Sequence, residues 1–345
     1  MKKTAVVLLN FGGPDSSITI KPFLFNLFND PAIINSPKLI RIIIAWFLCT
    51  HRKSTSKKIY ANFNYKSPLL NSTNSQAEAI KNRLDKNTHI FIAMRYWHPF
   101  IKEVAISIKQ WDPDQIILLP LYPQFSTVTT LSSIKEWQRV TDYIKLTKPT
   151  KMICCYPINK KMIEAQAFLL KKFIKKTKHD TRVLFSAHGL LRKIINSGDC
   201  YKEHVELTAN AIVEKLEIPN LDWIISYQSR IGKMDWIEPF TDSEIRRAGN
   251  DGKALIIQPI TFVSECSETK FELDIKYSKL ARDVGVPLYL RVPTLGSNKI
   301  FIDGLIDLIM KAKATNNHIC SNNICSMNIK KLCDINTSIY CGYAI

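Results

Sequence analysis

The sequence predicts an α/β protein with two doubly wound parallel sheets of four strands each. Eight short apolar, β-branched segments alternate with longer stretches of helical periodicity, and several of the eight lack strict alternation, as strands covered on both faces do. The second half of the chain also repeats the first: VVLLNFGGP and IILLPLYPQFS are followed, in the same order, by VLFSAHGLL and LIIQPITFVS. A closed eight-stranded barrel is the alternative, and the repeat favours two sheets.

The predicted strands are, in chain order, Thr4–Asn10, His89–Tyr96, Gln115–Pro123, Lys151–Tyr156, Arg182–His188, Trp223–Gln228, Ala254–Val263 and Pro287–Val292. Helical spacing of apolar residues is clear in Ile158–Lys175 and Lys202–Leu216. We expect a first domain of residues 1–150, completed by a returning helix at about 297–314, and a second domain of residues 151–296. Residues 315–345 are rich in Asn and Ser and predict a tail without its own core.

Ligand-binding residues are expected at one edge of each sheet, because the carboxyl ends of parallel strands meet there. The predicted strand ends bring an imidazole, arginines, carboxylates and aromatic rings to that edge. In the segment SECSETKFELDIKY, Glu268 and Glu272 are four residues apart and share one face of a helix. These groups suit a flat, apolar ligand handled by acid–base or metal chemistry. For the acids, a solvated helix N-terminus is the alternative.

The chain is strongly basic, with 48 Lys and Arg against 30 Asp and Glu and a formal charge of +18. Such a surface attracts nucleic acid, phospholipid head groups or an acidic small molecule. No Arg-rich helix, zinc-finger spacing or aromatic RNA-binding strand indicates nucleic acid. The GGPD turn lacks both the G-x-G-x-x-G and the Walker lysine patterns, so nucleotide binding is disfavoured as well.

The first residues, MKKTAVVLLNFGGPD, resemble a signal peptide only in their basic start, because the apolar stretch spans about seven residues and no cleavage site follows. They predict a buried first strand of a cytoplasmic protein. No apolar segment reaches the ~18–20 residues that span a bilayer. The segment Leu39–Cys49 predicts a core-packed helix; the alternative is an interfacial helix that rests on the inner face of a membrane.

An ordered set of motifs resembles the bacterial ferrochelatases, which insert ferrous iron into protoporphyrin IX to form protohaem in the final step of haem biosynthesis. The matching segments, between residues of about 5 and 300, are LLNFGGPDS, KPFLFNLFND, MRYWHP, LLPLYPQFSTVTT, LFSAHG, YQSRIG, DWIEP, ITFVSE-x-x-ET-x-x-ELD and PTLGSN. The resemblance implies a lyase with the class II chelatase fold, two Rossmann-like domains with a porphyrin cleft between them. The implied partners are protoporphyrin IX and ferrous iron.

By this resemblance His188 and Glu268 are the catalytic residues, which face each other across the porphyrin. His188 either accepts pyrrole protons or binds the incoming metal, and its unperturbed pKa of about 6.5 suits proton transfer near neutral pH. The implied metal ligands are His188, Glu268 and Glu272, the last on an inner acidic path. The implied substrate-binding residues of the cleft wall are Phe11, Met94, Arg95, Tyr96, Tyr122, Ser126 and Thr127.

The sequence departs from the family pattern at several positions. Leu191 replaces a proline after SAHGL, Cys266 replaces a histidine between the two acids, and Phe63-Asn64-Tyr65 replaces I-G-G. We expect activity because His188 and Glu268 are retained. The alternatives are a catalytically impaired homologue that binds porphyrin or metal, which the substitutions at 191 and 266 favour, and a ferrochelatase that acts on coproporphyrin.

The nine cysteines follow no secretory signal, which argues against a disulfide framework. Four of them crowd the tail. Some ferrochelatases hold a [2Fe–2S] cluster with C-terminal cysteines and one from the middle of the chain, and thiolates are the usual ligands. The resemblance therefore implies a cluster whose ligands are Cys155, Cys325, Cys333 and Cys341. The alternative is a tail without a cofactor, in which case nothing beyond the substrate Fe²⁺ is required.

Overall fold

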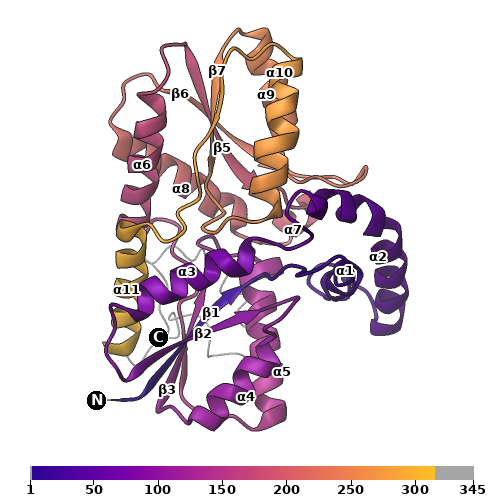
Figure 1. Ribbon diagram of the computed structural model, residues 1–345, viewed down its shortest axis with the longest axis vertical. Coiled ribbons are helices and arrows are strands. Elements are labelled where there is room, and N and C mark those ends of the chain that lie inside the picture. Colours follow the sequence, from indigo (N-terminus) through magenta and orange to yellow (C-terminus); the bar gives the residue numbers. More distant parts are fainter. Residues whose placement is uncertain (1, 315–345) are drawn as a thin grey trace. The chain divides into compact units, whose positions relative to one another are not determined.

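The computed structural model describes residues 2–314 and divides them into two compact units (Figure 1). Unit 1 runs to Cys154 and takes up the chain again from Ile306, whereas unit 2 holds Cys155–Leu305. The last described helix, α11 (Lys299–Ala314), therefore contributes to both units. Each unit contains one four-stranded parallel sheet.

In unit 1 the strand order is β2-β1-β3-β4. The strands are β1 (Thr4–Asn10), β2 (Thr88–Met94), β3 (Gln115–Pro120) and β4 (Thr150–Met152). Every residue of β1 is buried, as expected for a central strand that is covered on both faces. The register pairs Asn10 with Met94 and Leu9 with Pro120, so these three strands end at one edge of the sheet.

Five α-helices and a short π-helix belong to unit 1. They are α1 (Ile20–Phe28), α2 (Lys38–Ala61), α3 (Leu69–Lys81), α4 (Ile101–Trp111), α5 (Ser132–Ile144) and the π-helix η1 (Thr127–Leu131). The π-helix follows β3 and continues directly into α5. It therefore begins at the carboxyl edge of the sheet.

Unit 2 has the equivalent strand order, β6-β5-β7-β8. The strands are β5 (Thr181–His188), β6 (Asp222–Gln228), β7 (Ala254–Pro259) and β8 (Tyr289–Arg291). The helices are α6 (Lys160–Ile174), α7 (Arg192–Asn196), α8 (Tyr201–Leu216), α9 (Thr241–Asn250), α10 (Ser278–Asp283) and the π-helix η2 (Glu268–Tyr277). Helices α6 and α8 pack together on one face of the sheet, and α9 and α10 pack on the other (Figure 1).

The two units repeat one plan in detail. After β2 and β6 the chain turns through cis prolines, and Met94 N–H donates to Pro99 O as Tyr227 N–H donates to Pro239 O, both at 2.8 Å. A π-helix follows the third strand of each unit. The eight predicted strands and the predicted repeat are thus confirmed, with boundaries that differ by a few residues.

Helix α2 corrects the expectation of a core-packed segment at Leu39–Cys49. Ala45 and Cys49 are buried, but five large apolar side chains of this segment are 52–76% exposed. They are Leu39, Ile40, Ile43, Trp46 and Phe47. The prediction was wrong because α2 packs against α1 along one face only, and apolar residues occur around more of its circumference. No helix within residues 2–314 has the length and apolar character needed to cross a membrane.

Candidate active site

His188 stands at the carboxyl end of β5, where it is paired in register with Gln228 of β6. Two side chains hold its main chain. The His188 N–H donates to Thr261 Oγ1 at 3.3 Å, and its carbonyl oxygen accepts from the Tyr201 hydroxyl at 2.9 Å. The backbone of this residue is therefore fixed from two elements, the loop after β7 and the start of α8.

The contacts of the His188 ring decide which nitrogen carries the proton. Nδ1 lies 2.8 Å from the carbonyl oxygen of Gly189. A carbonyl oxygen only accepts hydrogen bonds, so Nδ1 is the protonated nitrogen of the neutral ring. Nε2 is then the atom with a lone pair, able to take a proton or to bind a metal ion.

Glu272, in the second turn of η2, is bound by the last residue of β6 and the residue after it. Its Oε2 accepts hydrogen bonds from Ser229 Oγ and from Gln228 Nε2, the latter at 3.1 Å. Its Oε1 lies 3.7 Å from the ammonium group of Lys276. Two donors and a cation thus compensate a charge on this carboxylate.

Gln228 and Ser229 connect the end of β6 to η2. Both stand at a predicted strand end, in the motif YQSRIG, and neither was among the predicted catalytic, metal-binding or substrate-binding residues. Gln228 is completely buried, and its Oε1 accepts from Ser186 Oγ at 2.7 Å. Ser229 has a φ of 67°, a left-handed conformation that costs a non-glycine residue about 1–3 kcal/mol and concentrates at functional sites. Their position at the carboxyl end of a buried strand brings them to the ligand-binding edge of the sheet.

Glu268 begins η2, and its carboxylate accepts from Ser267 Oγ at 2.9 Å. Beside it lies Cys266, which replaces the histidine expected at that position. Burial, and after it the charge of Glu268, raise the pKa of the Cys266 thiol well above its usual value. A thiol that stays protonated does not act as a base at neutral pH.

The predicted metal ligands do not form a preassembled cage. Within residues 2–314, no three His, Cys, Asp or Glu side chains lie close enough together to hold a metal ion. An ion at this edge would meet fewer than three of His188, Glu268 and Glu272 at a time.

In unit 1, the predicted residue Arg95 belongs to a buried network around Asp30. The Arg95 guanidinium donates to Asp30 Oδ2 at 2.7 Å and to Ser132 Oγ at 2.9 Å. The Tyr96 hydroxyl donates to the same Asp30 oxygen at 2.8 Å, and the Ser132 hydroxyl donates to it as well. Because the Asp30 side chain is only 2% exposed, it neutralises Arg95 inside the unit. The sequence pattern did not single out Asp30, a lone acid after an apolar helix.

The other predicted substrate-binding residues lie around the same edge of unit 1. Phe11 is half-buried and meets the Tyr96 ring edge-on, with centroids 4.7 Å apart. Met94 and Tyr96 are buried, and Ser126 Oγ accepts from Val128 N–H at the start of η1. Of the remaining two, Tyr122 lies shortly after β3, and Thr127 is the first residue of η1. Substrate contact by these residues stays a prediction.

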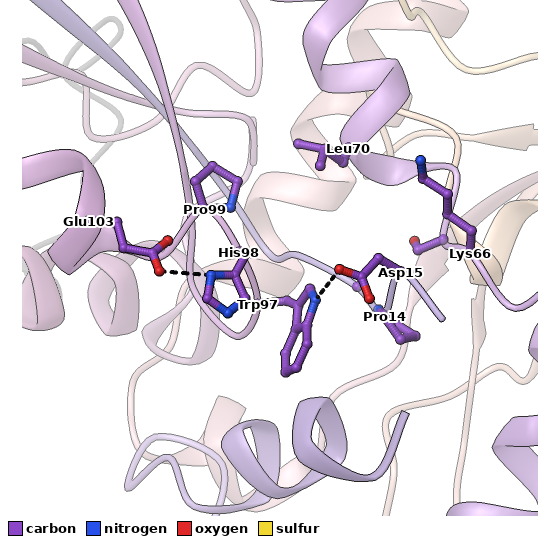
Figure 2. A pocket seen from close by; sticks show the side chains of 10 residues that line it. Pro14, Asp15, Lys66, Leu70, Trp97, His98, Pro99 and Glu103 are labelled. Carbon is purple, nitrogen blue, oxygen red and sulfur yellow. Dashed lines mark hydrogen bonds and ion pairs between the residues drawn. The ribbon is translucent and has the colours of Figure 1, made fainter. Parts of the chain in front are cut away.

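Figure 2 shows a separate pocket of about 250 Å³ in unit 1. Trp97 Nε1 donates to Asp15 at 3.1 Å on one side, and His98 pairs with Glu103 at 2.8 Å on the other. The volume falls below the range of roughly 300–1,000 Å³ that is typical of drug-sized ligands. This pocket is therefore too small to enclose a tetrapyrrole.

The predicted cluster ligands divide between described and undescribed parts of the chain. Cys155 is completely buried at the start of unit 2. Cys325, Cys333 and Cys341 lie outside the described residues. The iron–sulfur cluster stays a prediction.

Comparison with known proteins gives a consistent result. The family model described as ferrochelatase matches residues 3–313. The ferrochelatase of Wolbachia sp. subsp. Drosophila simulans (strain wRi) is 49% identical over 312 residues, which cover 89% of this chain and 98% of that protein. The ferrochelatase of Caulobacter vibrioides (strain NA1000 / CB15N) is 46% identical over 330 residues, which cover 92% and 94% of the two chains.

Solved structures support the fold. SirB from Bacillus subtilis with Fe³⁺ has a TM-score of 0.58 at 12% identity. The match covers 90% of this chain and 96% of the SirB chain. The sirohydrochlorin chelatase SirB from Bacillus subtilis subspecies spizizenii, in complex with cobalt, has a TM-score of 0.55 at 10% identity. With the strand order of each sheet, these matches confirm the predicted class II chelatase fold.

Replacement of Asp30 by Asn should strongly destabilise unit 1. The variant leaves the buried Arg95 cation without its charged partner, which costs about 3–5 kcal/mol. Urea unfolding followed by circular dichroism would measure the loss. The matched control is Asp112→Asn, which removes an ion pair to Lys148 from an exposed carboxylate and should leave the midpoint unchanged. Equal midpoints for the two variants would contradict the role assigned to Asp30.

Proposed function

The chain belongs to the ferrochelatase family, and we propose that His188 is the proton acceptor and Glu268 and Glu272 the metal-handling acids of its reaction. The activity of the chain is the insertion of iron into a porphyrin, and its enzyme class is lyase, in haem biosynthesis. The observation that carries the residue assignment is the tautomer of His188, whose Nε2 lone pair stands at the same sheet edge as the two acids.

Iron insertion requires the pyrrole nitrogens of the macrocycle to lose two protons while Fe²⁺ sheds its water. His188 Nε2 accepts a pyrrole proton as a general base. The Gly189 carbonyl oxygen, at 2.8 Å from Nδ1, stabilises the imidazolium that forms. The hydrogen bonds that Thr261 and Tyr201 form with the His188 backbone keep the ring in place during the transfer.

The two carboxylates serve the metal side of the reaction. Glu272 is oriented by Gln228, which is paired in register with His188, and by Ser229, the next residue along the chain. Carboxylate oxygens bind ferrous iron and release it more readily than a complete cage of ligands would. We infer that iron passes between Glu272 and Glu268 on its way to the macrocycle. At the two departures from the family pattern, Leu191 forms an isolated β-bridge with Trp236, and Cys266 is buried.

We propose protoporphyrin IX and ferrous iron as the substrates. The test uses the purified full chain under anoxia with Fe²⁺ and either protoporphyrin IX or coproporphyrin, and follows the loss of porphyrin fluorescence. Protoporphyrin should be metallated with the higher kcat/KM. A clear preference for coproporphyrin would contradict the proposed substrate, and porphyrin binding without any metallation would contradict the activity.

His188→Asn should lower kcat by about 10²–10⁴-fold, the usual contribution of a positioned general base. Porphyrin affinity, measured by fluorescence titration, should stay unchanged. The matched control is His179→Asn, the same chemical change on an exposed residue before β5. A His188→Asn variant that turns over at the control rate would rule out this residue as the base.

We also propose that α2 rests on an anionic membrane surface at the cytoplasmic face. The exposed residues Leu39, Ile43 and Trp46 follow one another at helical spacing, and the same stripe continues with Lys53 and Lys57. An apolar stripe that ends in cations complements a bilayer with negative head groups. The net charge of +18 favours the same surface.

The double variant Trp46→Ser/Phe47→Ser should lose most of its binding to phosphatidylglycerol vesicles. Two aromatic side chains leave the bilayer, each worth roughly 1.5–3 kcal/mol when buried, so the partition coefficient should fall more than about tenfold. Co-sedimentation measures the effect, and neutral phosphatidylcholine vesicles should bind the wild type weakly. Phe168→Ser, which removes an exposed aromatic ring of α6, is the control. Equal binding of both variants would contradict the proposal.

A further inference from the structure

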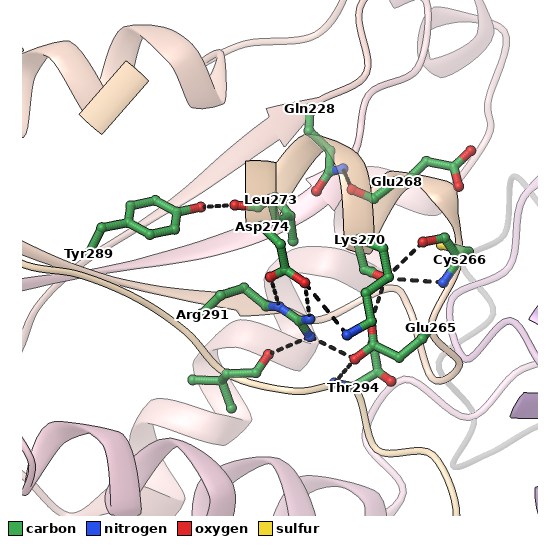
Figure 3. A network of polar contacts seen from close by, with 12 residues as sticks. Gln228, Glu265, Cys266, Glu268, Lys270, Leu273, Asp274, Tyr289, Arg291 and Thr294 are labelled. Carbon is green, nitrogen blue, oxygen red and sulfur yellow. Dashed lines mark hydrogen bonds and ion pairs between the residues drawn. The ribbon is translucent and has the colours of Figure 1, made fainter. Parts of the chain in front are cut away.

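Arg291, at the end of β8, joins two carboxylates that flank the metal-handling acids of η2 (Figure 3). Its Nη1 donates to Glu265 Oε1 at 2.6 Å. Its Nε and Nη2 donate to the two oxygens of Asp274 at 2.6 and 2.7 Å, a bidentate pair. The Arg291 side chain is only 9% exposed. We call this set of three side chains the Arg291 clamp.

Arg291 binds the chain on both sides of the segment that contains Glu268 and Glu272. Glu265 lies three residues before Glu268, and Asp274 lies two residues after Glu272. The second oxygen of Glu265 accepts a hydrogen bond from Thr269 Oγ1 at 2.5 Å. Glu265 thus connects Arg291 to the first turn of η2. In Figure 3 the carboxylate of Glu268 points away from the clamp. Arg291 can therefore govern the acids only through the helix.

A helix of this kind needs external support. η2 is a π-helix of ten residues, whereas π-helices are rare and mostly limited to a single turn. β8 supplies a second contact, because the Tyr289 hydroxyl donates to the carbonyl oxygen of Leu273 at 2.7 Å. If η2 relaxed to α-helical hydrogen bonding, the residues after Glu268 would rotate about the helix axis, and Glu272 would turn away from its partners Gln228 and Ser229.

We propose that Arg291 is a positioning residue for metal delivery, which sets the register of η2 and so the placement of Glu268 and Glu272. The inference rests on the proposed function of these two acids. Electrostatics supports the clamp: burial alone would raise the pKa of the Glu265 carboxyl, but the charge of Arg291 lowers it below its usual value. Glu265 therefore remains the charged partner that the clamp requires.

Arg182 provides a matched control in the same unit. It is 8% exposed and also binds two carboxylates, Asp222 at 3.0 Å and Asp251 at 2.9 Å. It belongs to the first residues of β5, at the amino edge of the sheet, whereas the acids of η2 follow the carboxyl edge. Arg182→Lys and Arg291→Lys thus both lose guanidinium hydrogen bonds to two carboxylates and keep the charge. A general loss of stability should affect both variants alike.

The experiment compares Arg291→Lys and Arg182→Lys with the wild-type full chain. Initial rates are measured with Fe²⁺ varied at saturating protoporphyrin IX, and with protoporphyrin IX varied at saturating Fe²⁺. Arg291→Lys should lose about 10–100-fold in kcat/KM for iron, the usual effect of a residue that orients metal ligands. Its KM for the porphyrin should stay unchanged, and Arg182→Lys should match the wild type in both series.

Equal kinetics of the two lysine variants, or an equal rise of both KM values in Arg291→Lys, would overturn the inference and leave the proposed function intact. Should Arg291→Lys fail to fold, Asp274→Asn, which removes the charge of the bidentate partner and with it the 3.6 Å ion pair to Lys270, must show the same selective loss for iron. Dialysis equilibrium of Fe²⁺ with the porphyrin-free protein gives a readout independent of turnover. Weaker iron binding in Arg291→Lys than in Arg182→Lys would support the role of Arg291 even if neither the wild type nor the variants inserted iron. The lack of iron insertion would refute the proposed function alone.

Discussion

Parallel strand pairing is the constraint on which the site depends, because it brings the carboxyl ends of neighbouring strands to one edge of each sheet. In unit 2 this register sets His188 beside Gln228, and the chain that leaves β7 returns to the same edge as η2. Gln228 then bonds Glu272 directly. A histidine and two glutamates that are about eighty residues apart in the sequence thus come to one edge without any motif that contains them all.

Both units place a π-helix after their third strand, and in both a largely buried arginine binds at least one carboxylate close by. In unit 1, Arg95 meets Asp30 and Ser132 beside η1, and in unit 2 Arg291 meets Glu265 and Asp274 beside η2. A buried ion pair adds little net stability, because desolvation offsets its Coulomb energy. Its hydrogen bonds nevertheless restrict geometry, since any rearrangement would leave a buried charge unpaired. These arginines therefore act on the structure as constraints on position.

The sequence allowed prediction of the eight strands, of the internal repeat, and of His188 at a strand end. Those features rest on local patterns, namely apolar runs, polar residues after them and helical spacing. For helix α2, local patterns did not predict which residues are buried. Its apolar residues could cover a core or face outward, and only the packing of α2 on α1 shows that Trp46 and Phe47 are exposed. Periodicity identifies a helix, but when apolar residues surround it, periodicity does not say which face is buried.

What the sequence by itself determined is the order of elements and the residue types at the strand ends, since both follow from neighbours along the chain. Tertiary structure decided the partners: Asp30 for Arg95 at a separation of 65 residues, and Glu265 for Arg291 at 26. It also decided the tautomer of His188, through the turn that brings the Gly189 carbonyl to Nδ1. The physical reason is that a charged side chain accepts many partners in principle, and only the folded backbone brings one of them within hydrogen-bond distance.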